Sequence, residues 1–210
     1  MSVISKAKLL KLLESSDEDS RIVLTPLLSR DQIGNATVDF RLGTTLLYRK
    51  RSQTAVIDVT DALESKRRQK HLYEKVRLRL HEPFVLHPKE LVLASTLEYL
   101  GLPMNVFAIV ASRSSWGRLG KVVATAAMVQ PGYRGCLTLE LTNLGDRPMR
   151  LYPGLLIGHI AFFEVSPKLP RVQYRGRYDC PTEPEMSRFF HTDSPEESFW
   201  GLDGVERNLD

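Results

Sequence analysis

Beyond about the first twenty residues, almost every apolar run in the sequence is short, alternates with polar residues and ends near Gly, Pro or Asn. Alternation places the apolar side chains on one face of an extended strand, and Gly, Pro and Asn favour turns. Many such runs at close spacing predict an antiparallel β protein, either a sandwich or a distorted barrel. The expected strands are 37–42, 46–50, 55–58, 84–86, 91–99, 106–111, 121–129, 136–143, 149–151 and 156–165.

The two ends of the chain differ from this β-rich middle. The first residues predict a helix over 2–14, with Ser2 as its N-cap and apolar side chains roughly on one face, and the polar stretch 15–20 ends it. From about 167 to 210 the sequence is rich in Pro, Glu, Asp and Arg and has little periodicity. Such a tail either stays mobile or folds over another part of the protein.

The length of 210 residues fits one globular domain, or one domain with a small appendage. The most apolar stretches, 91–102 and 151–165, are interrupted well before about 20 apolar residues accumulate, which excludes a membrane-spanning helix. The start of the chain lacks the apolar core of a secretory signal. Two cysteines, Cys136 and Cys180, exclude a disulfide-rich scaffold and cannot by themselves form a structural zinc site. We therefore expect a cytoplasmic protein in a reducing compartment, with no membrane partner.

The net charge of +4 is compatible with acidic partners, which include nucleic acids and nucleotides. Much of the excess lies in one basic run, residues 66–79. This run lacks interleaved aromatic residues apart from Tyr73, so a solvated edge or loop is favoured over a nucleic-acid-binding patch. Nucleic acid is accordingly not the expected partner, and steep salt dependence of DNA binding would be the mark of that alternative.

The first segment that could carry chemistry is 111–120, ASRSSWGRLG. A strand ends there, and Ser112 is the expected cap of a single helical turn. Ser114 and Arg118 are four residues apart and therefore share a face of that turn. The amide groups at its start, together with Arg113 and Arg118, would suit an oligophosphate. The alternative is an ordinary capped turn with surface arginines.

The second segment is 130–143, QPGYRGCLTLELTN, in which a Pro-Gly turn precedes a cleanly alternating strand. The alternation directs Leu137, Leu139 and Leu141 to the core, and Cys136, Thr138, Glu140 and Thr142 to the opposite face. A carboxylate between small neutral neighbours could take and return protons, which makes Glu140 a candidate acid/base. The alternative is a solvent-facing glutamate on a half-exposed sheet.

The third segment is the polar arm 174–188, whose arginines could close over phosphates as a lid. Several common motifs are absent from the sequence. A zinc-type nucleobase deaminase needs an H-x-E element and a P-C-x-x-C pair, and the chain has neither. The sequence also contains no G-x-x-x-x-G-K-[ST] loop and no G-x-G-x-x-G fingerprint, so it offers no support for P-loop or Rossmann nucleotide binding.

In this order and spacing, ASRSSWGRLG, PGYRGCLTLELTN and LYPGLLIGHI resemble the dCTP deaminase branch of the dUTP pyrophosphatase superfamily. Upstream, 33–43 (IGNATVDFRLG) and 87–94 (HPKELVLA) are similar to that family's N-terminal strand motif and to the segment before its central sheet. Downstream, 177–188 is similar to its C-terminal arm. The resemblance covers about residues 1–190, and its most specific part is the combination of the RSSxxR element with the glutamate strand.

The resemblance implies a mainly β fold, a distorted antiparallel β-barrel (dUTPase-like) with a short N-terminal helix and a C-terminal arm. The expected division is a barrel domain over 1–170 and an arm over 171–210 that closes over the nucleotide site. The implied assembly is a homotrimer with sites between subunits. The implied ligand is dCTP or a related deoxynucleoside triphosphate, accompanied by Mg²⁺ and without zinc or any other protein-bound metal.

The site residues implied by the resemblance fall into four groups. Glu140 matches the catalytic acid/base, with Ser114 and Arg118 as orienters of the attacking water. The nucleotide-binding turn is matched by Arg113, Ser114, Ser115 and Arg118; the base-binding region by Ala126, Thr138 and Leu139; and the triphosphate-binding tail by Tyr174 and Arg177. Three residues depart from the family pattern: Gln130 replaces an Asp, Arg177 replaces a Lys, and Pro181 stands where a Gln is common.

The resemblance predicts hydrolytic deamination of dCTP to dUTP and ammonia. In dUTP pyrophosphatases the residue matching Gln130 is an Asp tied to the deoxyribose and to the hydrolytic water, and an amide cannot act as that base. Gln130 therefore weakens two alternatives, a dUTP pyrophosphatase and a bifunctional deaminase-pyrophosphatase. A non-catalytic trimeric nucleotide sensor is a further alternative, disfavoured because a pure binder has little use for Glu140.

Overall fold

The computed structural model describes residues 2–50, 71–123, 127–165, 178 and 180–187. The chain divides into two compact units. The larger unit comprises Met1–Arg49 and Lys75–Glu185, and the smaller one comprises Lys50–Glu74 and Met186–Asp210. In the described part of the smaller unit, the Lys50 amide donates a hydrogen bond to the Leu72 carbonyl at 2.7 Å. The expected division into 1–170 and 171–210 stays a prediction.

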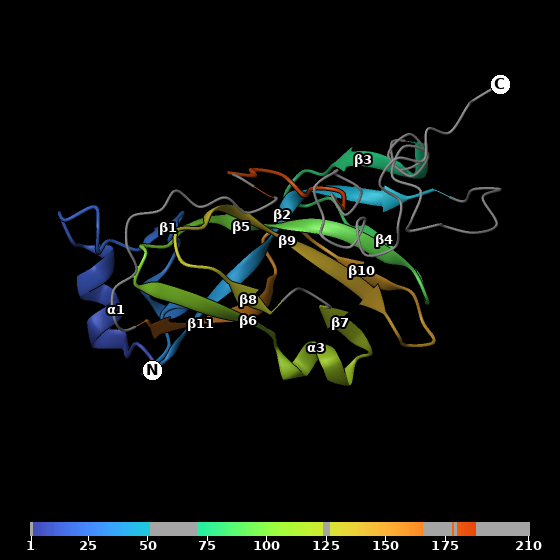
Figure 1. The fold of residues 1–210 in the computed structure, drawn as a ribbon. Helices are drawn as coiled ribbons and strands as arrows, with labels where there is room; N and C mark the ends of the chain where they lie inside the picture. Colours follow the sequence, from blue (N-terminus) through green and yellow to red (C-terminus); the bar gives the residue numbers. More distant parts are fainter. Residues whose placement is uncertain (1, 51–70, 124–126, 166–177, 179, 188–210) are drawn as a thin grey trace, which may run out of the picture. The chain divides into compact units, whose positions relative to one another are not determined.

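The larger unit is built mainly from strands (Figure 1). They are β1 (Val23–Thr25), β2 (Thr37–Arg49), β3 (Tyr73–Arg77), β4 (Phe84–Leu86), β5 (Leu91–Gly101), β6 (Val106–Ser112), β7 (Lys121–Val123), β8 (Met128–Val129), β9 (Arg134–Asn143), β10 (Met149–Leu151) and β11 (Leu156–Glu164). The helical elements are α1 (Lys6–Leu13), the 3-10 turn η1 (Arg30–Gln32) and the short α3 (Ser114–Arg118).

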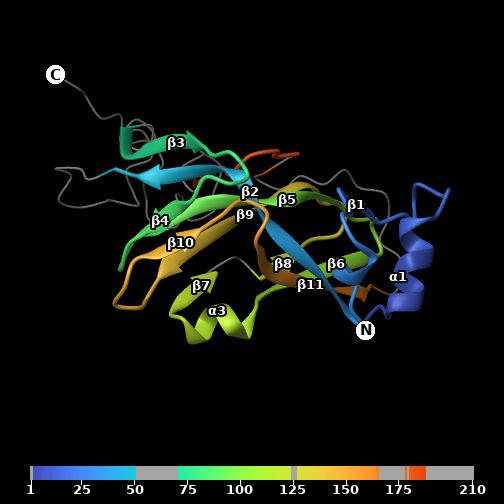
Figure 2. The same cartoon turned by 180° about the vertical axis from the view of Figure 1, so that it is seen from behind.

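Nine of these strands form one sheet in the order β7-β9-β5-β2-β11-β6-β8, with β1 added to β5 and β3 to β2. A separate antiparallel pair joins β4 to β10. Figures 1 and 2 show the long sheet curled rather than flat. Register breaks in the β2–β5, β5–β9 and β2–β11 ladders contribute to this bending, because extra residues in one strand kink it against its partner. The predicted mainly β fold with a distorted antiparallel barrel is confirmed.

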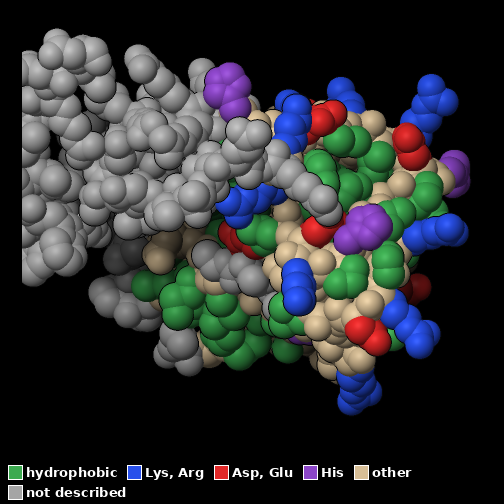
Figure 3. Space-filling view, turned by 90° about the vertical axis from the view of Figure 1, so that its right-hand side faces the viewer, with side chains coloured by type: hydrophobic (Ala, Val, Ile, Leu, Met, Phe, Trp, Pro, Cys, Tyr) green, Lys and Arg blue, Asp and Glu red, His purple; other side chains and the backbone are tan. Residues whose placement is uncertain are grey.

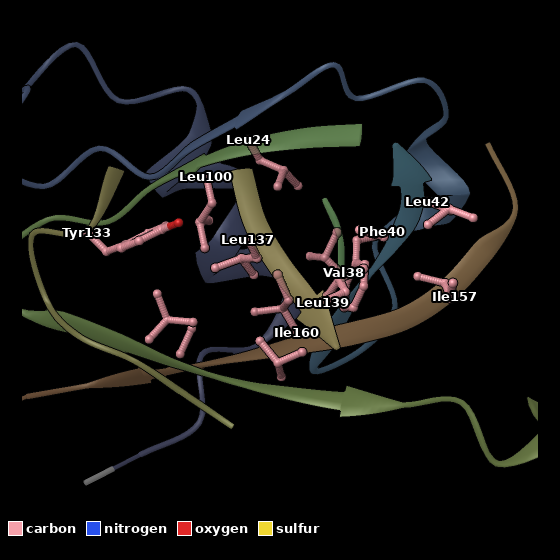
Figure 4. Close-up of a cluster of buried hydrophobic side chains, with 14 of the residues drawn as sticks. Leu24, Val38, Phe40, Leu42, Leu100, Tyr133, Leu137, Leu139, Ile157 and Ile160 are labelled. Carbon is pink, nitrogen blue, oxygen red and sulfur yellow. The ribbon is translucent and has the colours of Figure 1, made fainter. Parts of the chain in front are cut away.

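The concave interior is filled by the apolar side chains that the alternation predicted. Leu137, Leu139 and Leu141 are all buried, whereas Thr138 and Glu140 between them are only partly buried. Figure 4 shows Leu137 and Leu139 within the cluster of apolar side chains drawn from several strands. The face assignment of β9 made from the sequence is therefore confirmed, and Glu140 stands on the opposite face from the core.

The predicted helix starts later than expected. It begins at Lys6 with Ser5 as its N-cap, so the assignment of Ser2 as the cap is wrong. Residues 2 and 3 instead extend the sheet: Val3 forms a bridge with Phe163, and the Ser2 carbonyl accepts from the Glu164 amide at 3.1 Å. Pairing with a strand far along the chain thus overrides the local capping signal.

The predicted strands 84–86 and 149–151 agree with the structure, and most others differ only at their ends. The runs 37–42 and 46–50 form one strand, β2, whose register breaks between Leu42 and Leu46. The expected strand 121–129 is replaced by β7 and β8, with 124–126 outside the described residues, and 55–58 also lies outside them. The sequence did not predict β1 or β3; β3 lies within the basic run 66–79 and is an exposed strand beside β2.

Candidate active site

The Ser- and Arg-rich turn is the helix α3, which follows directly on β6. Arg113, in an extended conformation, is its N-cap, so the expected cap at Ser112 is wrong. Ser112 still pairs with Gly158 in the β6–β11 ladder and therefore belongs to the strand. Gly120 has a φ of +83° and ends the turn in the left-handed region, as the sequence predicted. The Trp116 indole anchors the turn by donating to the Leu156 carbonyl at 2.8 Å.

The polar groups of this turn face outward. Ser114, Ser115 and Arg118 are exposed, and Arg113 is partly exposed. The Arg113 guanidinium lies 3.6 Å from the Asp39 carboxylate on β2, which holds one edge of the guanidinium in place. Two hydroxyls and two guanidinium groups on one short turn provide donors of the kind that phosphate oxygens accept.

The turn is joined to the glutamate strand through β7. Figures 1 and 2 both show α3 beside β7, and β7 pairs with the end of β9, with Val122 opposite Thr142 and Val123 opposite Leu141. The Leu144 amide also donates to the Gly120 carbonyl at 2.8 Å. The structure therefore brings the turn and the β9 strand together at the β7 edge of the sheet.

On β9, Glu140 is partly buried and its Oε2 atom is shielded from solvent. Thr138, on the same face, accepts a hydrogen bond from the Glu185 amide at 3.2 Å through its hydroxyl oxygen. Leu139 between them is fully buried. A carboxylate of this kind, beside a sheltered strand face, is suited to general acid/base chemistry.

The C-terminal segment 180–187 reaches the same strand. The Pro181 carbonyl accepts from the Cys136 amide at 2.6 Å. Gly135 has a φ of +139°, and a Cβ there would lie 2.4 Å from the Pro181 ring. Only glycine at position 135 therefore permits this close approach.

The segment 180–187 is also held by Glu183. Its carboxylate pairs with Lys75 of β3 and accepts from the Thr45 hydroxyl of β2 at 3.4 Å. The hydrogen bond from Lys75 lowers the pKa of the Glu183 carboxyl below its ordinary value. The sequence analysis singled out Tyr174, Pro181 and the arginines of the arm but not Glu183, so this acidic anchor was missed. An isolated Glu in a polar tail carries no signal of its partner.

The Cys180 thiol of this segment lies near the Tyr99 phenol, and the Cys136 thiol lies on β9 beside Pro181. The Tyr99 hydroxyl is 3.6 Å from the Cys180 sulfur, and burial together with Cys180 raises the pKa of Tyr99 to about 12. Burial, with a smaller contribution from the charge of Glu98, raises the pKa of the Cys136 thiol. At neutral pH the Cys136 thiol therefore stays protonated, which makes it a poor nucleophile.

Other predicted site residues lie elsewhere or outside the description. Gln130 is exposed in the turn before β9, where its carbonyl accepts from the Tyr133 amide at 3.2 Å. Ala126, Tyr174 and Arg177 fall outside the described residues, so their placement in the site stays a prediction.

Neither a metal-binding cluster nor a membrane-spanning helix occurs in the described ranges. There, the His, Cys, Asp and Glu side chains form no group of three or more that could hold a metal ion. Nor does any helix in that part of the chain have the length and apolar character to cross a membrane. Around α3 the described groups are hydroxyls and guanidinium groups, which fit phosphate oxygens, and the nearby Asp39 is already paired with Arg113. A divalent cation would fit this site as a companion of the phosphates rather than as an ion held by protein carboxylates.

Basic side chains do not gather into one stripe on the face shown in Figure 3. Among the described residues of that face, Lys and Arg are interspersed with acidic and hydrophobic side chains. A nucleic-acid-binding surface normally shows a continuous basic patch. This face therefore offers no argument for the nucleic-acid alternative.

The curled antiparallel sheet places the chain in the class of dUTPase-like β-barrel proteins. A solved structure of the same fold, 2'-deoxycytidine 5'-triphosphate deaminase from Agrobacterium tumefaciens, superposes with a TM-score of 0.55 at 20% identity. It covers 76% of this chain, which in turn spans 47% of that structure's length. A family model described as dCTP deaminase-like matches residues 3–165. The chain belongs to the dCTP deaminase family, as its sequence motifs predicted.

Two relatives illustrate the similarity. A dCTP deaminase of Halorubrum lacusprofundi is 36% identical over 201 residues, which are 91% of this chain and 95% of the relative. A "dCTP deaminase, dUMP-forming" of Dictyoglomus thermophilum is 37% identical over 176 residues, 81% of this chain and 88% of the relative. Both names give dCTP as the substrate, and only the second names a product, dUMP.

Proposed function

We propose that this protein deaminates dCTP hydrolytically to dUTP and ammonia, with Glu140 as the acid/base and without zinc. One observation carries the proposal: in a chain of the dCTP deaminase family, Glu140 stands on the non-core face of β9, with its Oε2 atom shielded from solvent. The serine- and arginine-bearing turn joins the same strand through β7.

The chemistry requires protons to move at three points. A water is deprotonated to attack C4 of the cytosine ring, N3 of the ring is protonated, and ammonia leaves. A single carboxylate that takes and returns protons can serve each step. Ser114 and Arg118 orient the water, and the backbone at Thr138 and Leu139 lies beside the base.

The triphosphate is bound by the donors of the α3 turn, Arg113, Ser114, Ser115 and Arg118, with Tyr174 and Arg177 of the arm completing the site. Mg²⁺ accompanies the triphosphate and offsets its charge. We further propose that the protein works as a homotrimer in the cytoplasm, with its sites between subunits. The exposure of the turn supports this arrangement, because a site built between subunits leaves its binding groups open in a single chain.

The decisive variant is Glu140→Gln, which keeps the shape of the side chain but removes its capacity to accept a proton. We expect it to abolish ammonia release from dCTP while nucleotide binding, followed by isothermal titration calorimetry, survives. Glu18→Gln, an exposed acid in the turn before β1, is the matched control and should leave turnover unchanged. Appreciable steady-state deamination by Glu140→Gln would contradict the role of Glu140.

A second candidate function is release of dUMP and pyrophosphate as well as ammonia. The specific observation in its favour is the similarity to the dUMP-forming relative of Dictyoglomus thermophilum. Gln130 stands against it, because an amide cannot activate a hydrolytic water. Purified protein with dCTP and Mg²⁺ should release ammonia alone, with and without a zinc chelator; pyrophosphate released together with ammonia would establish the bifunctional enzyme.

A further inference from the structure

The ladder between β5 and β9 breaks beside the proposed acid/base strand. Ser95 pairs with Thr138, and the next recorded pair is Tyr99 with Cys136. Residues 96–98 of β5 therefore stand opposite the single residue Leu137 of β9. A break of this kind disrupts the ladder locally, so backbone groups beside it need other hydrogen-bond partners.

The side chain of Thr96 replaces the missing ladder partner. Its hydroxyl oxygen accepts a hydrogen bond from the Leu137 amide at 2.9 Å and donates to the Glu98 carbonyl at 2.7 Å. Thr96 is only 3% exposed, so water does not replace it. Because a buried amide needs an acceptor, the Thr96 hydroxyl fixes the position of β9 at Leu137.

The irregular stretch 96–98 of β5 is also held through the side chain of Glu98. Its buried carboxylate accepts from the Arg41 amide at 2.8 Å and from the Gln32 side chain at 2.9 Å. The Arg41 guanidinium lies 3.2 Å from the same carboxylate. Thr96 therefore lies between the Leu137 amide of β9 and Glu98, which is itself bonded to Arg41 of β2.

The hydrogen bond between the Leu137 amide and the Thr96 hydroxyl lies close to Glu140 along β9. Leu137 precedes Thr138 and lies three residues before Glu140, and a shift of β9 by one residue would turn Glu140 to the core face. We propose that Thr96 is a positioning residue for Glu140, acting through the Leu137 amide. This inference rests on the proposed acid/base role of Glu140.

The test replaces Thr96 by Val, which keeps the shape but removes the hydroxyl. We expect kcat for ammonia release from dCTP to fall by about tenfold, with KM changed by less than about twofold, since reacting geometry rather than nucleotide binding is disturbed. Thr96→Ser restores the hydroxyl and should return kcat to within about twofold of the wild type. Thr96→Ala, which puts no methyl group against the Leu137 amide, replaces the Val variant if that variant does not fold.

Val110→Ala in β6 controls for stability, because it removes buried apolar volume from a strand that does not pair with β9. Three results would each overturn the inference. The first is wild-type turnover in both Thr96→Val and Thr96→Ala, the second is an inactive Thr96→Ser, and the third is an equal loss of kcat in Val110→Ala. Glu140→Gln is assayed in parallel. If Glu140→Gln retains turnover, both the role of Glu140 and this inference are overturned. If Glu140→Gln is inactive while Thr96→Val and Thr96→Ala are fully active, this inference alone is overturned.

Discussion

At the scale of single residues, Glu98 shows how a charged group is accommodated inside a β-sheet. Its side chain is 1% exposed, yet it accepts hydrogen bonds from a backbone amide, an amide side chain and a guanidinium group. Burial raises the pKa of the Glu98 carboxyl above its ordinary 4.5, and the contacts with Arg41 oppose that rise. Removing one partner of such a group is costly because the rest stay buried and unpaired.

The raised pKa of Glu98 predicts a pH dependence of stability. The folded protein holds the proton more tightly than the unfolded chain, so the stabilising contribution is complete below pH 4.5 and is lost as pH rises through the raised pKa. The free energy of unfolding of the wild type, measured relative to Glu98→Gln by urea denaturation, should therefore fall between pH 4.5 and neutrality. A difference that is constant or grows with pH would contradict this, and Glu18→Gln provides the control.

At the scale of elements, residues 180–185 form a strap on the surface of the larger unit, to which they belong. Its contacts include a backbone hydrogen bond to Cys136, a second to the Thr138 hydroxyl, and the Glu183–Lys75 ion pair. Gly135 allows the strap to lie directly on β9. The strap therefore contacts this face of β9 at Thr138, two residues before Glu140.

The anchoring of this strap by Glu183 is testable. We expect Lys75→Ala to increase the rate at which a protease cleaves the 180–187 segment, because the ion pair and its hydrogen bond are lost, while the rest of the larger unit stays resistant. Lys11→Ala on α1 is the matched control. Cleavage at the wild-type rate in Lys75→Ala would show that Glu183 does not hold the strap.

Acid should weaken the same anchor in the wild-type protein. The pKa of Glu183 is lowered by Lys75, so its contribution is present above the ordinary value of 4.5 and is lost as pH falls through the lowered pKa.

At the scale of the whole molecule, large apolar side chains stay exposed at the end of the candidate nucleotide-binding turn and on β8. Leu119, Met128 and Leu144 are 64%, 65% and 69% exposed, and Leu144 is joined to the end of the turn through the Gly120 carbonyl. Exposed apolar side chains of this size often mark a surface that another subunit covers.

The proposed homotrimer predicts a mass in solution of three times one chain, measured by light scattering. Leu119→Asp should shift the protein towards lower mass and reduce deamination together with it, because a charge on a covered apolar surface opposes association. Leu80→Asp, on another exposed loop, should leave both unchanged. A wild-type mass of one chain at assay concentration would contradict the assembly.

The order of short strands could be predicted from the sequence because alternation and turn residues act locally. The same local pattern placed Leu137, Leu139 and Leu141 in the core and Glu140 on the opposite face, and it located Gly120 as the end of the turn. The family motifs added the identity of the candidate site. These features depend on neighbours within a few residues, so one sequence is enough to determine them.

Only the tertiary structure decided which distant residues support that site. Thr96 satisfies the amide of Leu137 because two strands fall out of register, and Gly135 is needed because the C-terminal segment crosses it. Glu183 finds Lys75 across more than a hundred residues of chain. Such contacts follow from the register and closure of the whole sheet, which no local pattern of residues encodes.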